Sequence, residues 1–408
     1  MRSCVLSQTF RPGRSERVGW QSRSWMIRSR LLPMSLLILG LGGCNHVSST
    51  SPGPPPQLSI ANATDLGPIP TNPDILGRDG AYSALFQGYS VWLYGDTFLA
   101  KANAEDFTLI SDSWSFTTDL NAQGGISGFR EREDSAGAPT MILPETPAEQ
   151  AFNQAHNVNN CQAQPCGARW ALWPASMVVN PADNSALIFY MVVMAQPGAF
   201  NFQGIGNSVA LWHNFQQQPQ RPSRNPPIVA GHADLIFTES EPNFGSASFI
   251  SNGTLYAYGC GVPDNGADKG CRVGRADPAN AQDPSAWTFY AGNGNWSSEV
   301  SDAISVFSGA NILSVSWNNY LQQYIAVYSQ IFSQNVLIRT APNPEGPWSG
   351  AILAFVAMAP SGGGNVYDAH AHSEYDANGG QTIFVSYSRS TPAPFSSEVR
   401  LVSVTLQK

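Results

Sequence analysis

The chain carries little charge for its length. Only 12% of its 408 residues are Asp, Glu, Lys or Arg, and no apolar stretch of helical length follows residue 60. These shortages disfavour a helical enzyme. What the sequence does contain is 37 glycines, 30 prolines and 11% aromatic residues, a balance typical of an all-β extracellular domain rich in turns.

Several catalytic motifs are also missing. The run Gly362-Gly363-Gly364 has no Lys-Ser or Lys-Thr after it, so it is not a phosphate-binding loop. The sequence contains neither a Gly-x-Ser-x-Gly elbow nor a His-Glu-x-x-His helix. These absences exclude the phosphate-loop, serine-elbow and zincin classes of enzyme.

Residues 26–44 have the pattern of a bacterial lipoprotein signal. A start with two arginines precedes an apolar run too short to span a bilayer, and Leu-Gly-Gly-Cys at its end resembles a lipobox. We expect residues 1–43 to be a signal region cleaved before Cys44, with Met26 as the true start, and lipid on the Cys44 thiol. An ordinary secretion signal is the alternative. Residues 44–58 are rich in Ser and Pro and predict a flexible tether.

This organisation predicts a lipid-anchored monomer in the bacterial cell envelope, which contacts the membrane only through its anchor. Residues 1–43 hold seven Arg and one Glu, so their removal takes the formal charge from −8 to −14. So acidic a domain repels polyanions, which excludes nucleic acid as a partner and favours a neutral polysaccharide or oligosaccharide.

Four cysteines remain after Cys4 and Cys44 are set aside. They form two pairs that are close in sequence, Cys161 with Cys166 and Cys260 with Cys271. In an oxidising compartment such pairs predict two loop-closing disulfides. A zinc site is the alternative, but the spacing matches no usual zinc pattern.

One strand pattern recurs five times after residue 58. Each copy has a strand, a polar turn, an aromatic-rich second strand and a third strand. The second strands are expected at residues 91–95, 187–191, 255–259, 324–328 and 383–387, and the third strands at 113–118, 208–213, 271–276, 336–341 and 399–405. Turns rich in Asn, Gly and Asp precede four of the second strands, as in β-hairpins.

The spacing of these repeats predicts an all-β fold, a five-bladed β-propeller over residues 59–408 with four-stranded antiparallel blades. Residues 58–69 are expected to supply the outer strand of the last blade and so close the ring. A sandwich or an irregular barrel is the alternative, although neither explains a repeat of this length.

In a propeller the first strands line the central channel, so the residues that begin them gather at one mouth. Glycoside hydrolysis needs a protonated carboxyl group and an ionised one on either side of the scissile bond. We expect Asp79 as base or nucleophile, Glu241 as general acid with Glu239 as its substitute, and Asp96 as a further catalytic carboxylate. As alternatives, Asp79 caps a turn, Asp96 bonds a neighbouring blade, and Glu241 is a solvated loop acid.

The remaining residues at this mouth are expected to bind substrate. They are Arg78, which would also keep Asp79 ionised, the aromatic residues Tyr82 and Trp173, and Asp368 with His370. An aromatic residue at a strand start is equally consistent with plain core. The fourth blade is expected to contribute Glu299 and Asp302. No cofactor or metal ligand set is expected, and a structural cation in the channel stays open.

Two segments carry a family resemblance. Residues 77–83 (GRDGAYS) followed by 92–97 (WLYGDT) resemble the opening blade of the bacterial domain family of unknown function DUF4185. Residues 336–341 with Gly-Pro-Trp-Ser at 346–349 are similar to blades of that family and of the arabinanase-like and levanase-like five-bladed glycosidases. The resemblance implies the propeller fold and, as one option, endo-acting hydrolysis of D-arabinan. The second blade lacks the channel acid of the arabinanase-like families.

The sequence therefore predicts a glycoside hydrolase that acts on a cell-wall or extracellular polysaccharide, with an arabinan as one candidate. A non-catalytic, glycan-binding surface lipoprotein is the alternative, and a protein-interaction propeller of the envelope is a third hypothesis.

Overall fold

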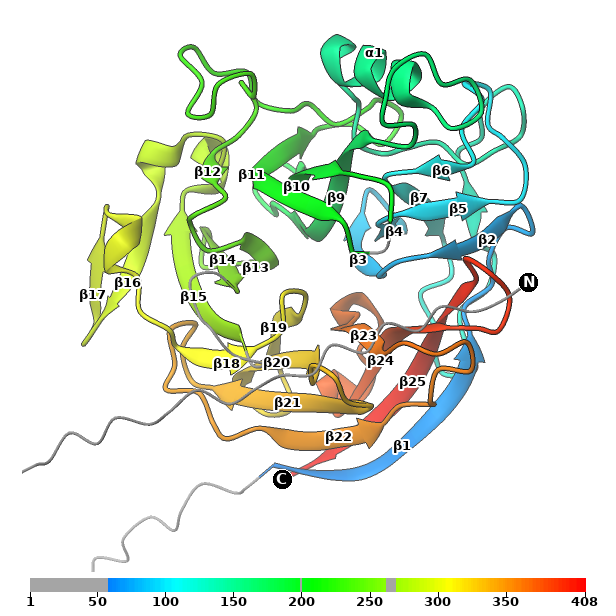
Figure 1. Ribbon diagram of the computed structural model, residues 1–408. Helices are drawn as coiled ribbons and strands as arrows, with labels where there is room; N and C mark the ends of the chain where they lie inside the picture. Colours follow the sequence, from blue (N-terminus) through cyan, green and yellow to red (C-terminus); the bar gives the residue numbers. More distant parts are fainter. Residues whose placement is uncertain (1–57, 199, 262–268) are drawn as a thin grey trace, which may run out of the picture. The chain divides into compact units, whose positions relative to one another are not determined.

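The computed structural model describes residues 58–198, 200–261 and 269–408 (Figure 1). The expected signal region, Cys44 and the tether up to residue 57 lie outside the described residues. Within the described ranges, none of the helices has the length and apolar character needed to cross a membrane.

The described chain is mostly β-structure, and several of its sheets are four-stranded and antiparallel, as the sequence predicted (Figure 1). The first sheet comprises β3 (Tyr82–Phe86), β4 (Tyr89–Tyr94), β7 (Ser113–Thr117) and β8 (Arg130–Glu131). A small side sheet joins β2 (Ile75–Arg78), β5 (Thr97–Leu99) and β6 (Leu109–Ile110).

The second sheet follows the helix α1 (Pro147–His156) and the third carries extra strands. The second comprises β9 (Arg169–Val179), β10 (Ala186–Ala195), β11 (Phe202–Trp212) and β12 (Phe237–Thr238). The third comprises β13 (Phe244–Ser251), β14 (Thr254–Cys260), β15 (Lys269–Ala276), β16 (Thr288–Gly292) and β17 (Asn295–Ser297), with β18 (Phe307–Gly309) paired to β15.

The fourth and fifth sheets complete the series. The fourth comprises β19 (Ser314–Asn318), β20 (Gln323–Ser329), β21 (Asn335–Ala341) and β22 (Ile352–Val356). The fifth comprises β23 (Val366–Ala371), β24 (Thr382–Ser390), β25 (Ser397–Gln407) and β1 (Ser59–Pro68). The antiparallel pairing of β1 with β25 confirms that residues near 58–69 supply the outer strand of the last sheet.

Short 3-10 helices lie in the connections, at Pro278–Asn280, Pro284–Ala286, Val300–Asp302, Ser373–Tyr375 and Asn378–Gly380. The expected position of two acids is wrong here. Glu299 and Asp302 are exposed beside the third of these helices, after β17, whereas the first strand of the fourth sheet begins only at Ser314. Both acids follow the outer strand β17, because the third sheet has more strands than the repeat predicted and the fourth sheet therefore begins later in the sequence.

Apolar side chains hold each sheet against the next. On β10, Leu187 and Phe189 join the core shared with the third sheet, whereas Ile188 and Tyr190 join the core shared with the first. This is the alternation of a strand buried on both faces. Further cores lie between the third and fourth, fourth and fifth, and fifth and first sheets, so the five sheets surround a common centre (Figure 1).

Both expected disulfides are present, which excludes the zinc alternative. Cys161 is bonded to Cys166 before β9, and Cys260 is bonded to Cys271 across β14 and β15.

A stability test follows from the contact between the second and third sheets. Gly245 has φ of 111°, and a Cβ there would lie 2.5 Å from Cβ of the buried Phe189. We expect Gly245→Ala to lower the free energy of unfolding by about 3 kcal/mol, because it adds a clash to the backbone strain. Urea unfolding at pH 7 measures the change.

Gly253→Ala is the matched control. Gly253 has φ of 75° with nothing within 4 Å of its added Cβ, so only about 1 kcal/mol is expected from the backbone. Equal losses in the two variants would contradict the tight contact with Phe189.

Candidate functional site

Three carboxyl groups from opposite ends of the described chain gather where the first and fifth sheets meet. Asp79 follows β2, Asp96 lies between β4 and β5, and Asp368 lies in β23. The amide of Asp79 donates to the Asp96 carbonyl over 3.1 Å, and the amide of Gly95 donates to the Asp79 carbonyl over 2.7 Å. These bonds fix Asp79 and Asp96 on adjacent backbones. We call Asp79, Asp96 and Asp368 the acidic cluster.

Two tyrosines cross the junction between these sheets. The Tyr367 hydroxyl donates to Oδ1 of Asp79 over 2.5 Å, and the Tyr82 hydroxyl donates to Oδ2 of Asp368 over 3.3 Å. Tyr367 precedes Asp368 in sequence, and Tyr82 follows Asp79 by three residues. Each sheet therefore supplies the hydrogen-bond donor to the other sheet's acid, which locks the relative position of the two carboxyl groups.

The environment of Asp79 favours its protonated form more than water does. Burial raises the pKa of Asp79 to about 6; the Tyr367 hydrogen bond opposes this rise, the charge of Asp96 adds to it and Arg169 opposes it. A carboxyl group with such a pKa is ionised for most of the time at pH 7 while remaining basic enough to accept a proton.

Asp368 is further shifted. Burial, with the charge of Asp79 adding to it, raises the pKa of Asp368 to about 7, and only the Tyr82 hydrogen bond lowers it. Its φ of 52° is unusual for a residue other than glycine, and it stands at an irregularity in the pairing of β23 with β24. Strained backbone of this kind is frequent at functional sites.

Asp96 differs from both because a cation lies against it. Its carboxylate forms an ion pair with Arg169 of β9 and accepts a hydrogen bond from the Trp173 indole N–H over 2.7 Å. The ring of Trp173 in turn meets the exposed Phe202 edge to face, with centroids 4.9 Å apart. Trp173 therefore lies beside one of the acids, as the sequence predicted.

Arg78 does not lie where the sequence placed it. Its guanidinium bonds Glu131 over 2.9 Å and stacks over the Tyr94 ring at 3.4 Å, and the residue is only 3% exposed. Adjacent residues on a strand point to opposite faces, so Arg78 and Asp79 separate. The positive charge expected from Arg78 is supplied by Arg169 instead.

Glu241 also has another partner. Its carboxylate accepts hydrogen bonds from the Thr238 amide over 2.6 Å and the Thr238 hydroxyl over 3.1 Å, closing the turn before β13. Glu239 accepts from Gln203 over 3.2 Å. The groups that act on Asp79 are thus Tyr367, Asp96 and Arg169, and Asp79 itself acts on Asp368. Glu241 instead bonds its own turn.

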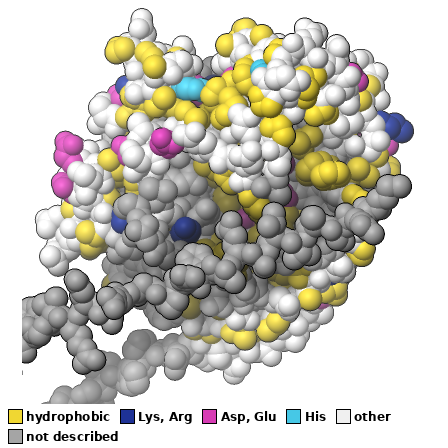
Figure 2. Space-filling model, viewed as in Figure 1, with side chains coloured by type: hydrophobic (Ala, Val, Ile, Leu, Met, Phe, Trp, Pro, Cys, Tyr) yellow, Lys and Arg dark blue, Asp and Glu magenta, His cyan; other side chains and the backbone are white. Residues whose placement is uncertain are grey.

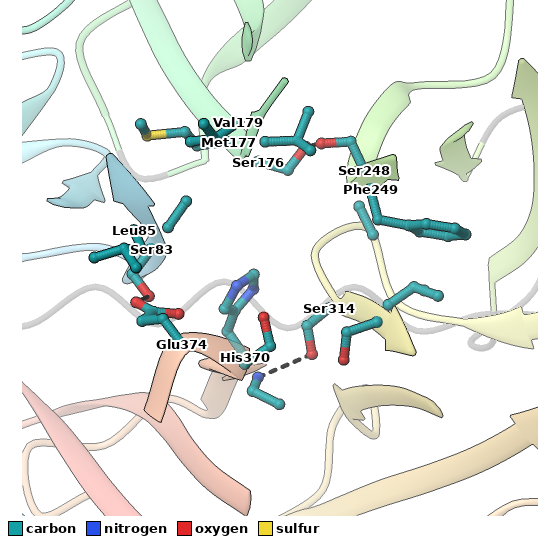
Figure 3. A pocket seen from close by; sticks show the side chains of 17 residues that line it. Ser83, Leu85, Ser176, Met177, Val179, Ser248, Phe249, Ser314, His370 and Glu374 are labelled. Carbon is teal, nitrogen blue, oxygen red and sulfur yellow. Dashed lines mark hydrogen bonds between the residues drawn. The ribbon is translucent and has the colours of Figure 1, made fainter. Parts of the chain in front are cut away.

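His370 connects the acidic cluster to the centre of the molecule. Its ring meets Tyr82 edge to face at 5.7 Å, and burial lowers its pKa to about 4, so it is neutral at pH 7. The same side chain lines a cavity of about 330 Å³ between the first strands (Figure 3). The lining combines polar side chains, among them Ser83, Ser176, Ser248, Ser314, Ser316 and Glu374, with apolar ones such as Leu85, Met177 and Phe249.

A second charged group lies outside this site. Glu149, His232 and Asp234 have ligand atoms close enough to share a metal ion. However, the Arg221 guanidinium bonds Glu149 over 2.6 Å and Asp234 over 2.7 Å. A guanidinium already neutralises these carboxylates, so this group is better explained as a buried ion-pair network.

Sequence reasoning assigned no role to Arg169 or Tyr367. Both residues stand at first-strand starts, beside Trp170 and Asp368 respectively, so their location was visible in the repeat. Their side-chain partners were not, because Arg169 and Tyr367 bond acids that are 73 and 288 residues away in sequence.

Several solved structures are similar to this chain. A candidate hydrolase from Bacteroides ovatus ATCC 8483 is 13% identical, with a TM-score of 0.52, over 80% of this chain and 85% of that chain. An α-L-arabinofuranosidase from Podospora anserina in complex with cellotriose is 10% identical, with a TM-score of 0.44, over 86% and 98% of the two chains.

A GH43_1 enzyme from Xanthomonas citri complexed with xylotriose is 14% identical, with a TM-score of 0.44, over 83% and 90% of the two chains. Identities this low show the fold alone. No curated protein matches the sequence. The model of the domain of unknown function DUF4185 matches residues 59–387, and the protein belongs to that family.

Proposed function

We propose that the described chain is a five-bladed β-propeller whose acidic cluster hydrolyses glycosidic bonds in a polysaccharide. The observation that carries the proposal is the pair of hydrogen bonds, from Tyr367 to Asp79 and from Tyr82 to Asp368, that holds these two carboxyl groups across the junction of the first and fifth sheets. Two coupled carboxyl groups with different pKa values are the equipment that glycosidic hydrolysis requires. The five interlocked sheets around a central cavity support the propeller.

The two environments suggest the division of labour. Asp368, with the higher pKa and a tyrosine as its partner, is suited to donate a proton to the leaving oxygen. Asp79, with the lower pKa and Arg169 nearby, is suited to act as base or nucleophile. Asp96 holds Arg169 and the Trp173 indole beside them, and Trp173 offers an aromatic face for a sugar ring. The general acid thus moves from Glu241 to Asp368.

Arabinan is the first substrate to test, because the family resemblance names that chemistry, and fructan and xylan complete the panel. We expect Asp79→Asn and Asp368→Asn each to lower kcat by about 1,000-fold, as loss of a catalytic acid or base does. Release of reducing sugar from the three polymers measures this. Asn is nearly isosteric with Asp, so the fold is retained.

Glu241→Gln is the control, and its kcat is expected to stay within about threefold of wild type because its partner is its own turn. Full activity in Asp79→Asn would remove Asp79 from the mechanism. Glycan binding by the wild type without any turnover would favour the alternative, a non-catalytic glycan-binding protein.

The two shifted pKa values predict a narrow pH optimum. Since Asp79 acts deprotonated, kcat/KM rises with pH through about 6; since Asp368 acts protonated, it falls through about 7. The two steps belong to the coupled pair. In Asp368→Asn, assayed on an aryl glycoside whose leaving group needs no protonation, the falling limb is expected to disappear. A retained falling limb would mean that another group is the acid.

We also propose that the protein is a lipid-anchored protein of the cell envelope, on the evidence of residues 26–44. Cells that express the full chain are expected to incorporate labelled palmitate into it, and Cys44→Ala to abolish the label. Incorporation that persists in Cys44→Ala would place the lipid elsewhere, and a wild-type chain without label would favour an ordinary secretion signal.

A further inference from the structure

Phe395 is an unusual residue for the place it occupies. It lies in the loop between β24 and β25 with 69% of its surface exposed, and its φ is 57°. A phenylalanine in the left-handed region is strained, and its exposed ring gains little from the fold. Glycine would satisfy this backbone at lower cost. The fold therefore does not account for an aromatic side chain here.

The ring of Phe395 is nevertheless held in a defined position. It stacks on Phe98 of β5 with centroids 4.9 Å apart and planes inclined by 22°. The loop is drawn close because Gly77 has no side chain: a Cβ there would lie 2.6 Å from the Phe395 carbonyl oxygen. The Ser397 hydroxyl also accepts from the Arg78 amide over 2.9 Å and donates to the Arg78 carbonyl over 3.0 Å.

This aromatic pair lies next to the acidic cluster. Phe98 follows Asp96 by two residues in sequence. β5 pairs with β2, the strand that ends one residue before Asp79, and Gly77 of β2 lies opposite Phe98. Asp96 also bonds Trp173, whose ring meets Phe202. Asp96 therefore has one aromatic pair bonded to it through Trp173 and another two residues along the chain.

We propose that Phe98 and Phe395 form a platform on which a sugar ring of the polysaccharide stacks, beyond the reacting carboxyl groups. The proposal rests on the glycosidase function proposed above and adds a binding subsite to it. The exposed ring of Phe395, stacked on the half-buried Phe98, suits the apolar face of a sugar. The viewed surface carries few charged side chains (Figure 2). Nearby carboxylates disfavour the anionic surface of a membrane, the other surface that exposed aromatics bind.

The test exploits the strained backbone. Phe395→Gly removes the ring and relieves the left-handed conformation, so the melting temperature is expected to stay the same or rise. If the platform binds sugar, KM for the polymer rises about tenfold through the lost apolar contact, while kcat/KM for a short aryl glycoside that does not reach the platform is unchanged. Arabinan, fructan and xylan are the polymer probes.

Phe332→Gly is the matched control. Phe332 lies in the loop between β20 and β21 of the fourth sheet, is 79% exposed and has φ of 56°. Like Phe395, Phe332 is exposed and has a left-handed backbone conformation, but it does not neighbour the acidic cluster. The loss of the Phe332 ring is therefore expected to leave KM for the polymer unchanged. Affinity electrophoresis in the same three polymers, with each substitution placed in the Asp368→Asn background, repeats the comparison without turnover.

The outcomes separate the two proposals. An active enzyme whose KM for the polymer is the same in Phe395→Gly and wild type overturns the platform and leaves the glycosidase standing. A wild type that neither binds nor cleaves any of the three polymers overturns both. Binding to vesicles of phosphatidylglycerol and phosphatidylethanolamine that is lost in Phe395→Gly, with polymer binding unaffected, overturns the platform in favour of a membrane contact.

Discussion

The candidate site depends on the closure of the ring between the first and fifth sheets. Tyr367 bonds Asp79 and Tyr82 bonds Asp368 only because β23 and β3 lie side by side. The outer edge is closed by β1, which pairs with β25 although the two are at opposite ends of the described chain. The inner edge is closed by the ring of His372, which stacks on Trp92 at 4.1 Å. Any loss of closure separates the acids.

Polar contacts at this junction reinforce the apolar ones. The Ser83 hydroxyl of the first sheet lies 2.6 Å from Nδ1 of His372, and the other ring nitrogen lies 2.7 Å from the Ser386 hydroxyl. Ser83 also bonds Glu374, which accepts from Ser90 over 2.9 Å. Burial lowers the pKa of His372 well below its usual value, so a neutral imidazole bridges the two sheets. A neutral imidazole can be buried at much lower cost than a charged one.

Closure also explains the electrostatics of the site. Asp79 and Asp368 are brought into a partly buried space where, among the described residues, no guanidinium forms an ion pair with Asp368, so mutual repulsion and lost hydration favour the protonated acid there. Asp96, one strand away, has Arg169 against it. The same fold thus places an acid without a cation and an acid with one within a single cluster. That contrast, rather than the number of acids, supports an acid–base function.

The sequence by itself determined the strands, their turns, both disulfides and the family. These depend on local pattern: the alternation along β10, the Asn and Gly residues of the hairpins, and cysteines close in sequence are all visible within a dozen residues. It also located Asp79 and Asp96 at strand ends and Asp368 near the start of the first strand of the last sheet. The pairing of side chains was decided only by the tertiary structure. Glu241 bonds its own turn, Arg78 turns to Glu131, and Arg169 with Tyr367 reaches acids distant in sequence. The direction of a side chain at a strand end depends on local twist and on which neighbouring sheet arrives beside it, and neither is encoded in the spacing of a repeat.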